Sequence, residues 1–219
     1  FSTDIYSVTL IQQIFDGLVQ FDQNLNIVPA IASSWSVSED GLTYTFSLRD
    51  DIKFHTGRQV TAADFVYSFT RLLDPKEESS ALSFFSRIKG ADHYRSAKSR
   101  EVDGLKALAS NMLEITLKEP FAPFLSLLAM KSSKVVPKEE IARLGADFSR
   151  HPVGTGPFRL ESWEGNQIVL SPNNDYYEGR PYLDKAVYSV YPGAQNEKIA
   201  EDFLAGRLDE LSRFLGIPV

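Results

Sequence analysis

The side chains of this sequence that could act in acid–base, nucleophilic or metal chemistry are few and scattered. The three histidines are His55, His93 and His151, and no two of them share a helix face or the spacing of a metal site. We interpret each as a surface or locally bonded residue rather than a catalytic one. Cysteine is absent, which excludes a disulfide, a thiol nucleophile and a cysteine metal site. The sequence therefore predicts no metal and no cofactor.

Carboxylates stand next to one another at residues 50–51, 77–78 and 139–140. Neighbouring side chains diverge in direction, so adjacency alone does not make an acid–base pair. There is no Gly-x-Ser-x-Gly motif for a nucleophilic serine, and no Lys-Ser/Thr follows Gly154-Thr155-Gly156 to complete a phosphate-binding loop. We expect a protein that is not an enzyme, with a secreted hydrolase as the minor alternative.

A tyrosine-rich run lies in the last third of the chain, at residues 176, 177, 182, 188 and 191. Such a run has two interpretations. The rings could line a cleft for a peptide or carbohydrate, or they could cover a sheet edge with the hydroxyl groups in water, which is the commoner arrangement.

Size and charge limit the classes of partner. With 219 residues the chain forms one large domain or two small ones, either of which can bury a core. The 23 basic and 29 acidic residues leave a net charge of −6 without a basic stripe, which argues against a nucleic-acid partner. No run of about 18 apolar residues suggests a membrane span.

The residues that must be positioned by a special backbone are Gly154, Thr155, Gly156 and Pro157. Glycine adopts φ > 0 or lets another backbone approach closely, and proline fixes φ and lacks a donor. An alternating segment, FRLESW at 158–163, follows directly. We therefore predict a backbone crossing between two structural units, where Gly154 or Gly156 has positive φ or no room for a Cβ.

The other elements follow from periodicity. Apolar residues at 42, 44, 46 and 48 alternate with polar ones and predict a hairpin with residues 35–37, and residues 52–54 suggest one more strand. Residues 61–73 read as a capped helix with Phe65, Val66, Phe69 and Leu72 on its core face, together with Tyr44 or Phe46. A first helix is expected to carry Leu18, and residues 89–103 are expected to be a surface excursion. Further strands are predicted at 105–107, 113–117, 158–163, 167–170 and 186–191, and further helices near 124–128, 138–144 and 197–205.

Several motifs occur in the order and spacing of one family. They are ASSW at 32–35, DGLTYTFSLR at 40–49, IKF at 52–54, GRQVTAADFVYSF at 57–69, DP at 74–75, PVGTGPF at 152–158, Trp163, NQIVL at 166–170 and NDYYEG at 174–179. In these motifs the chain, from about residue 15 to about residue 209, resembles the large extracytoplasmic solute-binding proteins of peptide ABC transporters, the oligopeptide- and dipeptide-binding type.

The resemblance implies a protein of the α/β class, with mixed α and β elements (α+β), and part of a type II periplasmic-binding-protein-like fold. Residues 1–15 would begin lobe I, residues 16–152 would form an inserted domain, and residues 153–219 would return to lobe I through the crossing. Relatives are about twice as long or longer, so the closing lobe is expected to be absent from this chain.

The resemblance also implies a function: a receptor that captures oligopeptides or a similar small solute outside the cytoplasmic membrane and delivers it to the permease of an ABC importer. Such a protein is expected in the periplasm or outside the cell, monomeric, with a lipid anchor as an option. A solute-sensing regulatory module of the same fold is the alternative. The segments facing the cleft would contribute Ile5, Tyr6, Ser79, Phe84 and Phe85. Relatives often place a tyrosine in the second segment, and this chain departs from that pattern with SSAL at 79–82.

Overall fold

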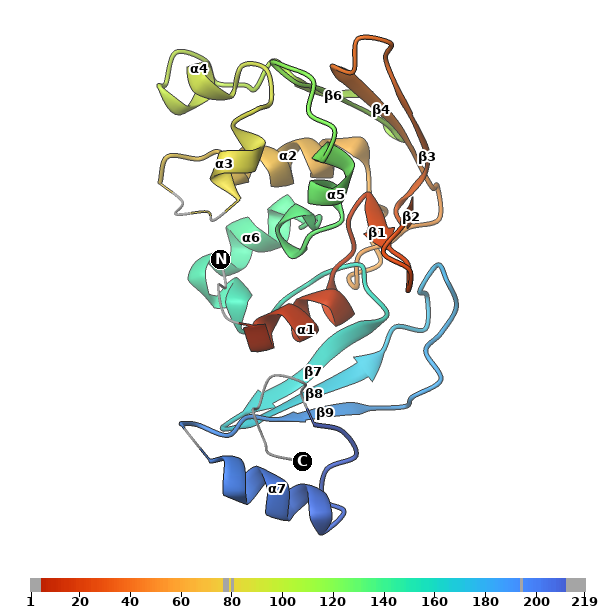
Figure 1. The fold of residues 1–219 in the computed structure, drawn as a ribbon, viewed down its shortest axis with the longest axis vertical. Helices are drawn as coiled ribbons and strands as arrows, with labels where there is room; N and C mark the ends of the chain where they lie inside the picture. Colours follow the sequence, from red (N-terminus) through yellow and green to blue (C-terminus); the bar gives the residue numbers. More distant parts are fainter. Residues whose placement is uncertain (1–4, 77–78, 80, 194, 212–219) are drawn as a thin grey trace.

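A computed structural model gives the arrangement of the chain and describes residues 5–76, 79, 81–193 and 195–211. The elements from β1 through η2 form an upper part, and α1, β7, β8, β9 and α7 form a lower part, stacked along the long axis (Figure 1). The two parts have separate sheets and largely separate hydrophobic cores.

A four-stranded antiparallel sheet is the main layer of the upper part. Its strands are β3 (Ala32–Val37), β4 (Thr43–Leu48), β5 (Leu105–Ala109) and β6 (Met112–Thr116), in the order β3-β4-β6-β5. Strand β4 buries Tyr44, Phe46 and Leu48 on one face, as its alternating sequence predicts. Gly41, at φ 70°, lies in the turn that joins β3 to β4.

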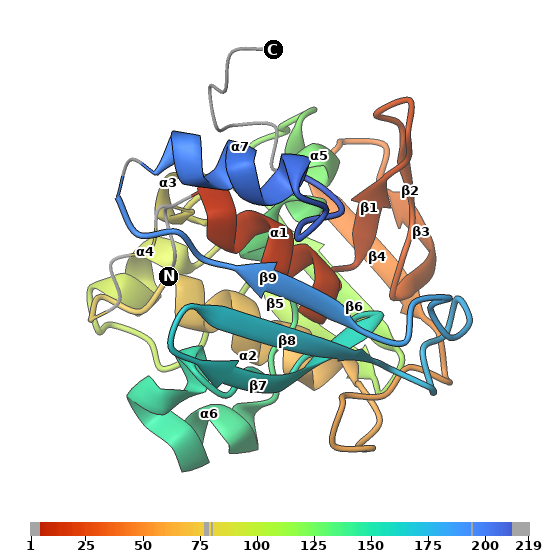
Figure 2. The ribbon, with the colours of Figure 1, turned by 90° about the horizontal axis from the view of Figure 1, so that it is seen from below.

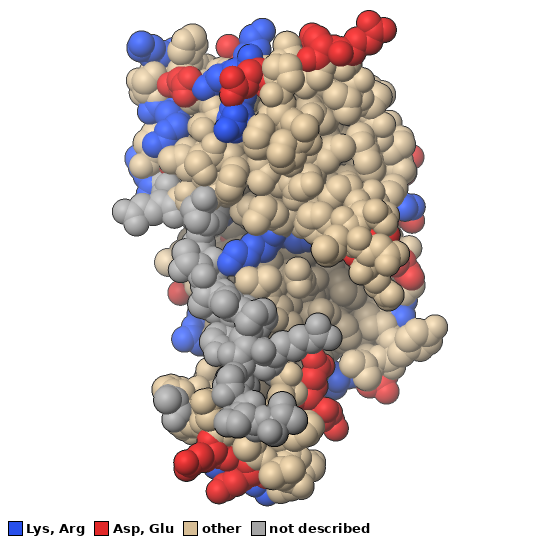
Figure 3. All heavy atoms as spheres, viewed as in Figure 1, with Lys and Arg blue, Asp and Glu red and all other residues tan. Residues whose placement is uncertain are grey.

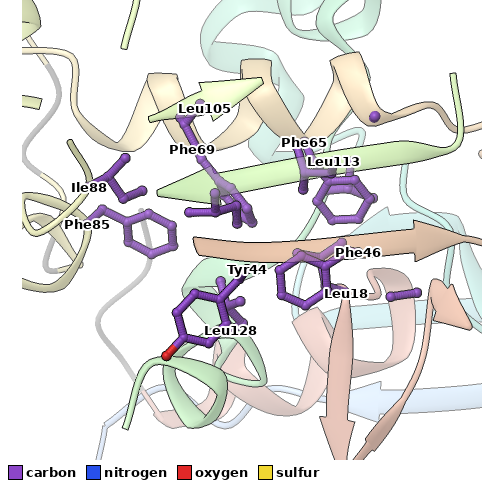
Figure 4. Close-up of a cluster of buried hydrophobic side chains, with 14 of the residues drawn as sticks. Leu18, Tyr44, Phe46, Phe65, Phe69, Phe85, Ile88, Leu105, Leu113 and Leu128 are labelled. Carbon is purple, nitrogen blue, oxygen red and sulfur yellow. The ribbon is translucent and has the colours of Figure 1, made fainter. Parts of the chain in front are cut away.

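Helix α2 (Ala62–Leu72) covers the buried face of this sheet. It begins after Thr61, whose backbone N–H donates to the Asp64 carboxylate at 2.8 Å, and it ends just before Asp74 and Pro75. Figure 4 shows Phe65 and Phe69 pointing toward Phe46 and Leu113 of the sheet. This main core is the one predicted from the sequence, except that Val66 is only partly buried.

Shorter elements complete the upper part. A two-stranded ribbon, β1 (Val19–Phe21) with β2 (Ile27–Pro29), lies beside the main sheet. The helices are α3 (Leu82–Phe85), α4 (Ala91–Arg95), α5 (Phe124–Leu128), η1 (Lys131–Ser133), α6 (Lys138–Leu144) and η2 (Gly145–Ser149).

The lower part is a three-stranded antiparallel sheet with a helix on each side (Figures 1 and 2). Its strands are β7 (Phe158–Glu164), β8 (Gln167–Pro172) and β9 (Ala186–Ser189), in that order. Helix α1 (Ile5–Ile14) packs against β7, and α7 (Asn196–Leu204) follows β9. The second core consists of Ile14, Phe15, Phe158, Ile168 and Leu170.

Some predicted elements were wrong in detail. Residues 52–54 form no strand, although Ile52 and Phe54 are buried in the main core. Their backbone pairs only with residues 58–60 across a tight turn, and Lys53 makes one isolated bridge to Gln59. Helix α1 ends at Ile14, so Leu18 belongs to the main core instead of the helix. The expected surface excursion at 89–103 contains α4, and its Ala91 and Val102 are buried.

Candidate functional site

The crossing of residues 154–157 lies against the end of α1, at the joint between the upper and lower parts. A Cβ on Gly154 would stand 1.9 Å from the Ile14 carbonyl oxygen, and one on Gly156 would stand 2.5 Å from that of Gln13. Gly156 donates its N–H to Ile14 O at 2.9 Å. The expected close approach of two backbones is confirmed, and it comes from contact rather than positive φ, which neither glycine has.

Thr155 ties the crossing to Asp16, the residue that leads from α1 toward β1. Its buried hydroxyl accepts the backbone N–H of Asp16 at 3.0 Å and donates to the Asp16 carboxylate at 3.2 Å. Val135, from the upper part, donates its N–H to Asp16 O at 3.0 Å. Asp16 is therefore held from both parts of the molecule.

The joint buries charge. Burial raises the pKa of Asp16 to about 6, an effect that Lys134 and the Thr155 hydroxyl partly offset. Burial likewise lowers the pKa of Lys134, and the negative charge of Asp16 opposes that shift. This arrangement puts a carboxylate and an ammonium group near each other where little water competes.

His55 closes the joint from the side of the upper part. The ring Nδ1 accepts the Gly154 N–H at 3.3 Å, and the ring Nε2 lies 3.1 Å from Gly156 O. The backbone N–H of His55 donates to Gly154 O at 2.8 Å. These partners are about a hundred residues away in sequence, so the expectation of a surface or locally bonded histidine was wrong for His55. His93 and His151 are exposed, as expected.

The tyrosines of the tyrosine-rich run differ in their surroundings. Tyr176 and Tyr177 lie at the joint with ring centroids 4.7 Å apart, and burial raises the pKa of both hydroxyls. The guanidinium of Arg49 lies 5.5 Å from the Tyr177 ring, while the Tyr177 hydroxyl is buried without a hydrogen-bond partner among the described residues. Tyr182, in contrast, is fully exposed.

The residues expected to face a ligand are placed as follows. Ile5 and Tyr6 begin α1, but their side chains lie outside what the structure describes. Ser79 is buried, and its hydroxyl accepts the Ala81 N–H at 3.2 Å. Phe84 is half-buried, and Phe85 is a core residue with its ring centroid 5.0 Å from that of Phe69. Figures 1 and 2 place α3 and the first residues of α1 on the same side of the molecule. Ligand contact by these five residues stays a prediction.

The surface between the two parts is concave. Figure 3 shows a hollow on the face drawn, with Lys and Arg side chains along its upper border and acidic side chains gathered around the α7 end. A shallow groove also runs between residues 150–153 and β7, where the guanidinium of Arg150 lies 4.2 Å from the Trp163 ring centroid.

Metal-binding geometry is not found in the described part of the chain. No group of three or more His, Asp or Glu side chains gathers there as a metal site. Among the described helices, none has the length and hydrophobicity needed to cross a membrane.

The fold of the chain is similar to that of solved periplasmic oligopeptide-binding proteins. Residues 26–215 match the bacterial extracellular solute-binding proteins, family 5 middle, and the chain belongs to this family. The family consists of binding proteins rather than enzymes.

Individual relatives differ in what they bind. Di/tripeptide-binding protein 2 of Pseudomonas aeruginosa is 33% identical over 75% of this chain and 32% of its own length. Heme-binding protein A of Haemophilus influenzae is 34% identical over 84% of this chain and 35% of its own length. The crystal structure of a periplasmic oligopeptide-binding protein from Borrelia burgdorferi is 32% identical with a TM-score of 0.88, and it covers 95% of this chain and 43% of that protein. The chain thus spans about a third of the length of these curated relatives.

Proposed function

We propose that this chain belongs to the solute-binding receptor of an ABC importer, which captures oligopeptides or a similar small solute and delivers it to a membrane permease. The observation that carries the proposal is the family match over residues 26–215. The likeness in fold to oligopeptide-binding proteins supports it. We further propose that the receptor acts in the periplasm or outside the cell, as a monomer and without catalytic turnover.

We propose the division into residues 1–15, 16–152 and 153–219, with 16–152 as an inserted domain and the flanking residues as lobe I. The two cores support this division, because one contains Leu18 through Val135 and the other joins Ile14 and Phe15 to β7 and β8. The inserted domain would be fixed to lobe I through the joint of Asp16, His55 and the crossing.

Binding in this scheme needs no covalent chemistry. Main-chain groups of an extended peptide would be held by hydrogen bonds, and its side chains would occupy roomy, hydrated pockets that tolerate different sequences. The surfaces that we propose for contact are the start of α1, with Ile5 and Tyr6, and the segment that contains Ser79 and Phe84.

Mass spectrometry of ligand that co-purifies with a longer natural polypeptide containing these residues tests the proposal. We expect peptides or another small organic solute in stoichiometric amount, released on denaturation. A preparation with no bound solute and no calorimetric response to a mixed peptide library would contradict it. Hydrolysis of those peptides would instead favour an enzyme, and a solute bound without an associated permease would favour a sensing module.

A further inference from the structure

The ring of His55 bonds to the crossing through both of its nitrogens. Gly154 N–H points at Nδ1, and the Gly156 carbonyl oxygen faces Nε2. A carbonyl oxygen can only accept, so Nε2 must carry the proton, and Nδ1 must be bare to accept from Gly154. The geometry therefore selects one neutral tautomer of the imidazole.

A second proton on the ring would destroy half of this arrangement. Protonated histidine is a donor at both nitrogens, so Nδ1–H would face the N–H of Gly154, donor against donor. The glycine cannot move freely, because the backbone of α1 lies so close that a Cβ on Gly154 would stand 1.9 Å from the Ile14 carbonyl oxygen. Protonation must therefore displace the ring or the crossing.

Among the residues that the structure describes, no negative charge acts on the ring to favour its protonation. Arg159, on β7, is the charged group that acts on the ring from the lower part, and it disfavours protonation. On the ring's own turn, Arg58 is engaged with Asp64 and Glu139. Asp16 lies across the crossing, where its carboxylate accepts a hydrogen bond from the Thr155 hydroxyl. Burial, the main cause, lowers the pKa of His55 to about 4.

We propose that His55 is a positioning residue whose neutral ring pins residues 154–156 against α1, and that protonation of this ring releases the joint between the upper and lower parts in mild acid. Release would also free the end of α1, since Gly156 and Thr155 hold Ile14 and Asp16. That α1 then carries a solute-facing segment with it rests on the proposed function; the release of the joint does not.

The expected pH dependence has a definite sign. The pKa of His55 falls from 6.5 in the unfolded chain to about 4 in the folded chain. Its contribution to stability is therefore complete above pH 6.5 and is lost as the pH falls toward 4. Asp16 acts in the opposite direction. Its pKa is raised to about 6 in the folded chain, so the folded state binds a proton at a higher pH than the unfolded chain, and the stability of the fold rises as acid neutralises the buried carboxylate. The two effects overlap, and Asp16→Asn isolates that of His55.

Nuclear magnetic resonance of the unmodified chain gives the first test. The histidine ring resonances, followed against pH, should show His55 as the Nε2–H tautomer at neutral pH and titrating near pH 4. A His55 ring in the Nδ1–H tautomer, or one that titrates at the 6.5 of an unfolded histidine, overturns the proposal without any variant.

Two substitutions give the second test, in a background of Asp16→Asn. His55→Asn places an amide oxygen near the Nδ1 position, and His55→Gln places an amide N–H near Nε2, so each restores one of the two bonds and neither titrates. Between pH 6.5 and pH 4, the unfolding equilibrium constant of D16N should rise about a hundredfold more than that of either double variant.

Hydrogen exchange at Gly154 and Gly156 shows where the effect acts. In D16N these two amides should lose protection in mild acid while those of β8 keep it, and in the His55 variants their protection should not change over the same range. Equal pH profiles with and without His55, or loss of protection spread evenly over the chain, would mean that His55 is only a structural residue and would refute its role as a release.

Discussion

Thr155 has the most constrained polar side chain at the joint. Its hydroxyl is almost wholly buried and is used twice, once as an acceptor from Asp16 N–H and once as a donor to the Asp16 carboxylate. A buried polar group without a partner costs on the order of 1–3 kcal/mol, so one hydroxyl prevents two such losses. The glycines on both sides let the backbone come close enough for that hydroxyl to reach.

Gly154→Ala tests the close approach directly. The added methyl group would lie 1.9 Å from the Ile14 carbonyl oxygen, a rigid backbone atom that cannot move without disturbing the end of α1. We expect a loss of stability well above the ~1 kcal/mol typical of glycine-to-alanine changes, measured by urea unfolding.

Gly165→Ala is the matched control for that measurement. Gly165 lies in the β7–β8 turn at φ 52° with open space around its Cα, so only conformational preference opposes the new side chain. Its loss should stay near ~1 kcal/mol. If Gly154→Ala costs no more than Gly165→Ala, the crossing is not sterically locked.

At the scale of elements, local patterns were sufficient to predict the upper part's main layers. The period of two in β4 and the helical spacing of Phe65 and Phe69 after a capped start each specify a buried face without reference to the rest of the chain. The same reasoning failed at Ile52 and Phe54, whose alternation looks like a strand although their backbone finds no neighbouring strand.

The joint could be predicted only in part, for a physical reason. Glycine spacing revealed the crossing, but the partners of the crossing, Asp16 and His55, come from elements remote in sequence. One signal was available: a carboxylate directly before Gly17, at the end of an apolar helix, is an uncommon site for a charge.

Phe69→Ala probes the packing of α2 on the main sheet. The side chain is fully buried, with neighbouring rings on Phe65 and Phe85, so truncation leaves a cavity. We expect a loss of about 3–5 kcal/mol in denaturant unfolding.

Phe203→Ala is its control, since Phe203 on α7 is 40% exposed and its removal opens less of a cavity. Equal losses from the two substitutions would mean that α2 is not the centre of the main core.

One acidic residue of helix α7 gathers several polar partners. The Asp202 carboxylate accepts the Tyr191 hydroxyl at 2.7 Å and pairs with Lys198 and Arg207, and these bonds hold its pKa below the usual range. Because that pKa is lowered, the contribution is present at neutral pH and is lost as acid protonates the carboxylate.

Asp202→Asn should therefore loosen α7 without affecting the main core. We expect faster amide exchange in residues 196–204 and unchanged exchange in α2. The protection of the α7 amides should also depend less on pH below neutrality in this variant than in the unmodified chain. Unchanged exchange in α7 would show that its apolar contacts alone hold it.

At the scale of the whole molecule, the proposed cleft requires two walls. A site that buries its ligand by closure gains affinity by removing water from both sides, and one wall leaves the polar groups of the ligand competing with solvent. We propose that the 219 residues here supply one wall and the inserted domain.

The 219-residue chain alone should therefore fold and bind peptide weakly. Halving the free energy of a micromolar site, about −8 kcal/mol, leaves about −4, which is millimolar. Calorimetry with the co-purified ligand, on this chain and on any longer polypeptide that contains it, measures the difference. Tight binding by the 219 residues alone would place the whole site within them and refute the two-walled scheme.

The contact between Asp16 and Thr155 also dictates an order of events during folding. These residues are 139 positions apart, and closing a flexible loop of that length costs roughly 4 kcal/mol of chain entropy. Folding of residues 17–135 lowers this cost to roughly 3 kcal/mol, because Val135 pairs with Asp16 and returns the chain to its starting point. Only the short stretch up to Thr155 then remains to be closed. We therefore expect the main sheet to form first and the second sheet to dock afterwards, so that pulsed hydrogen exchange should find β4 protected before β8.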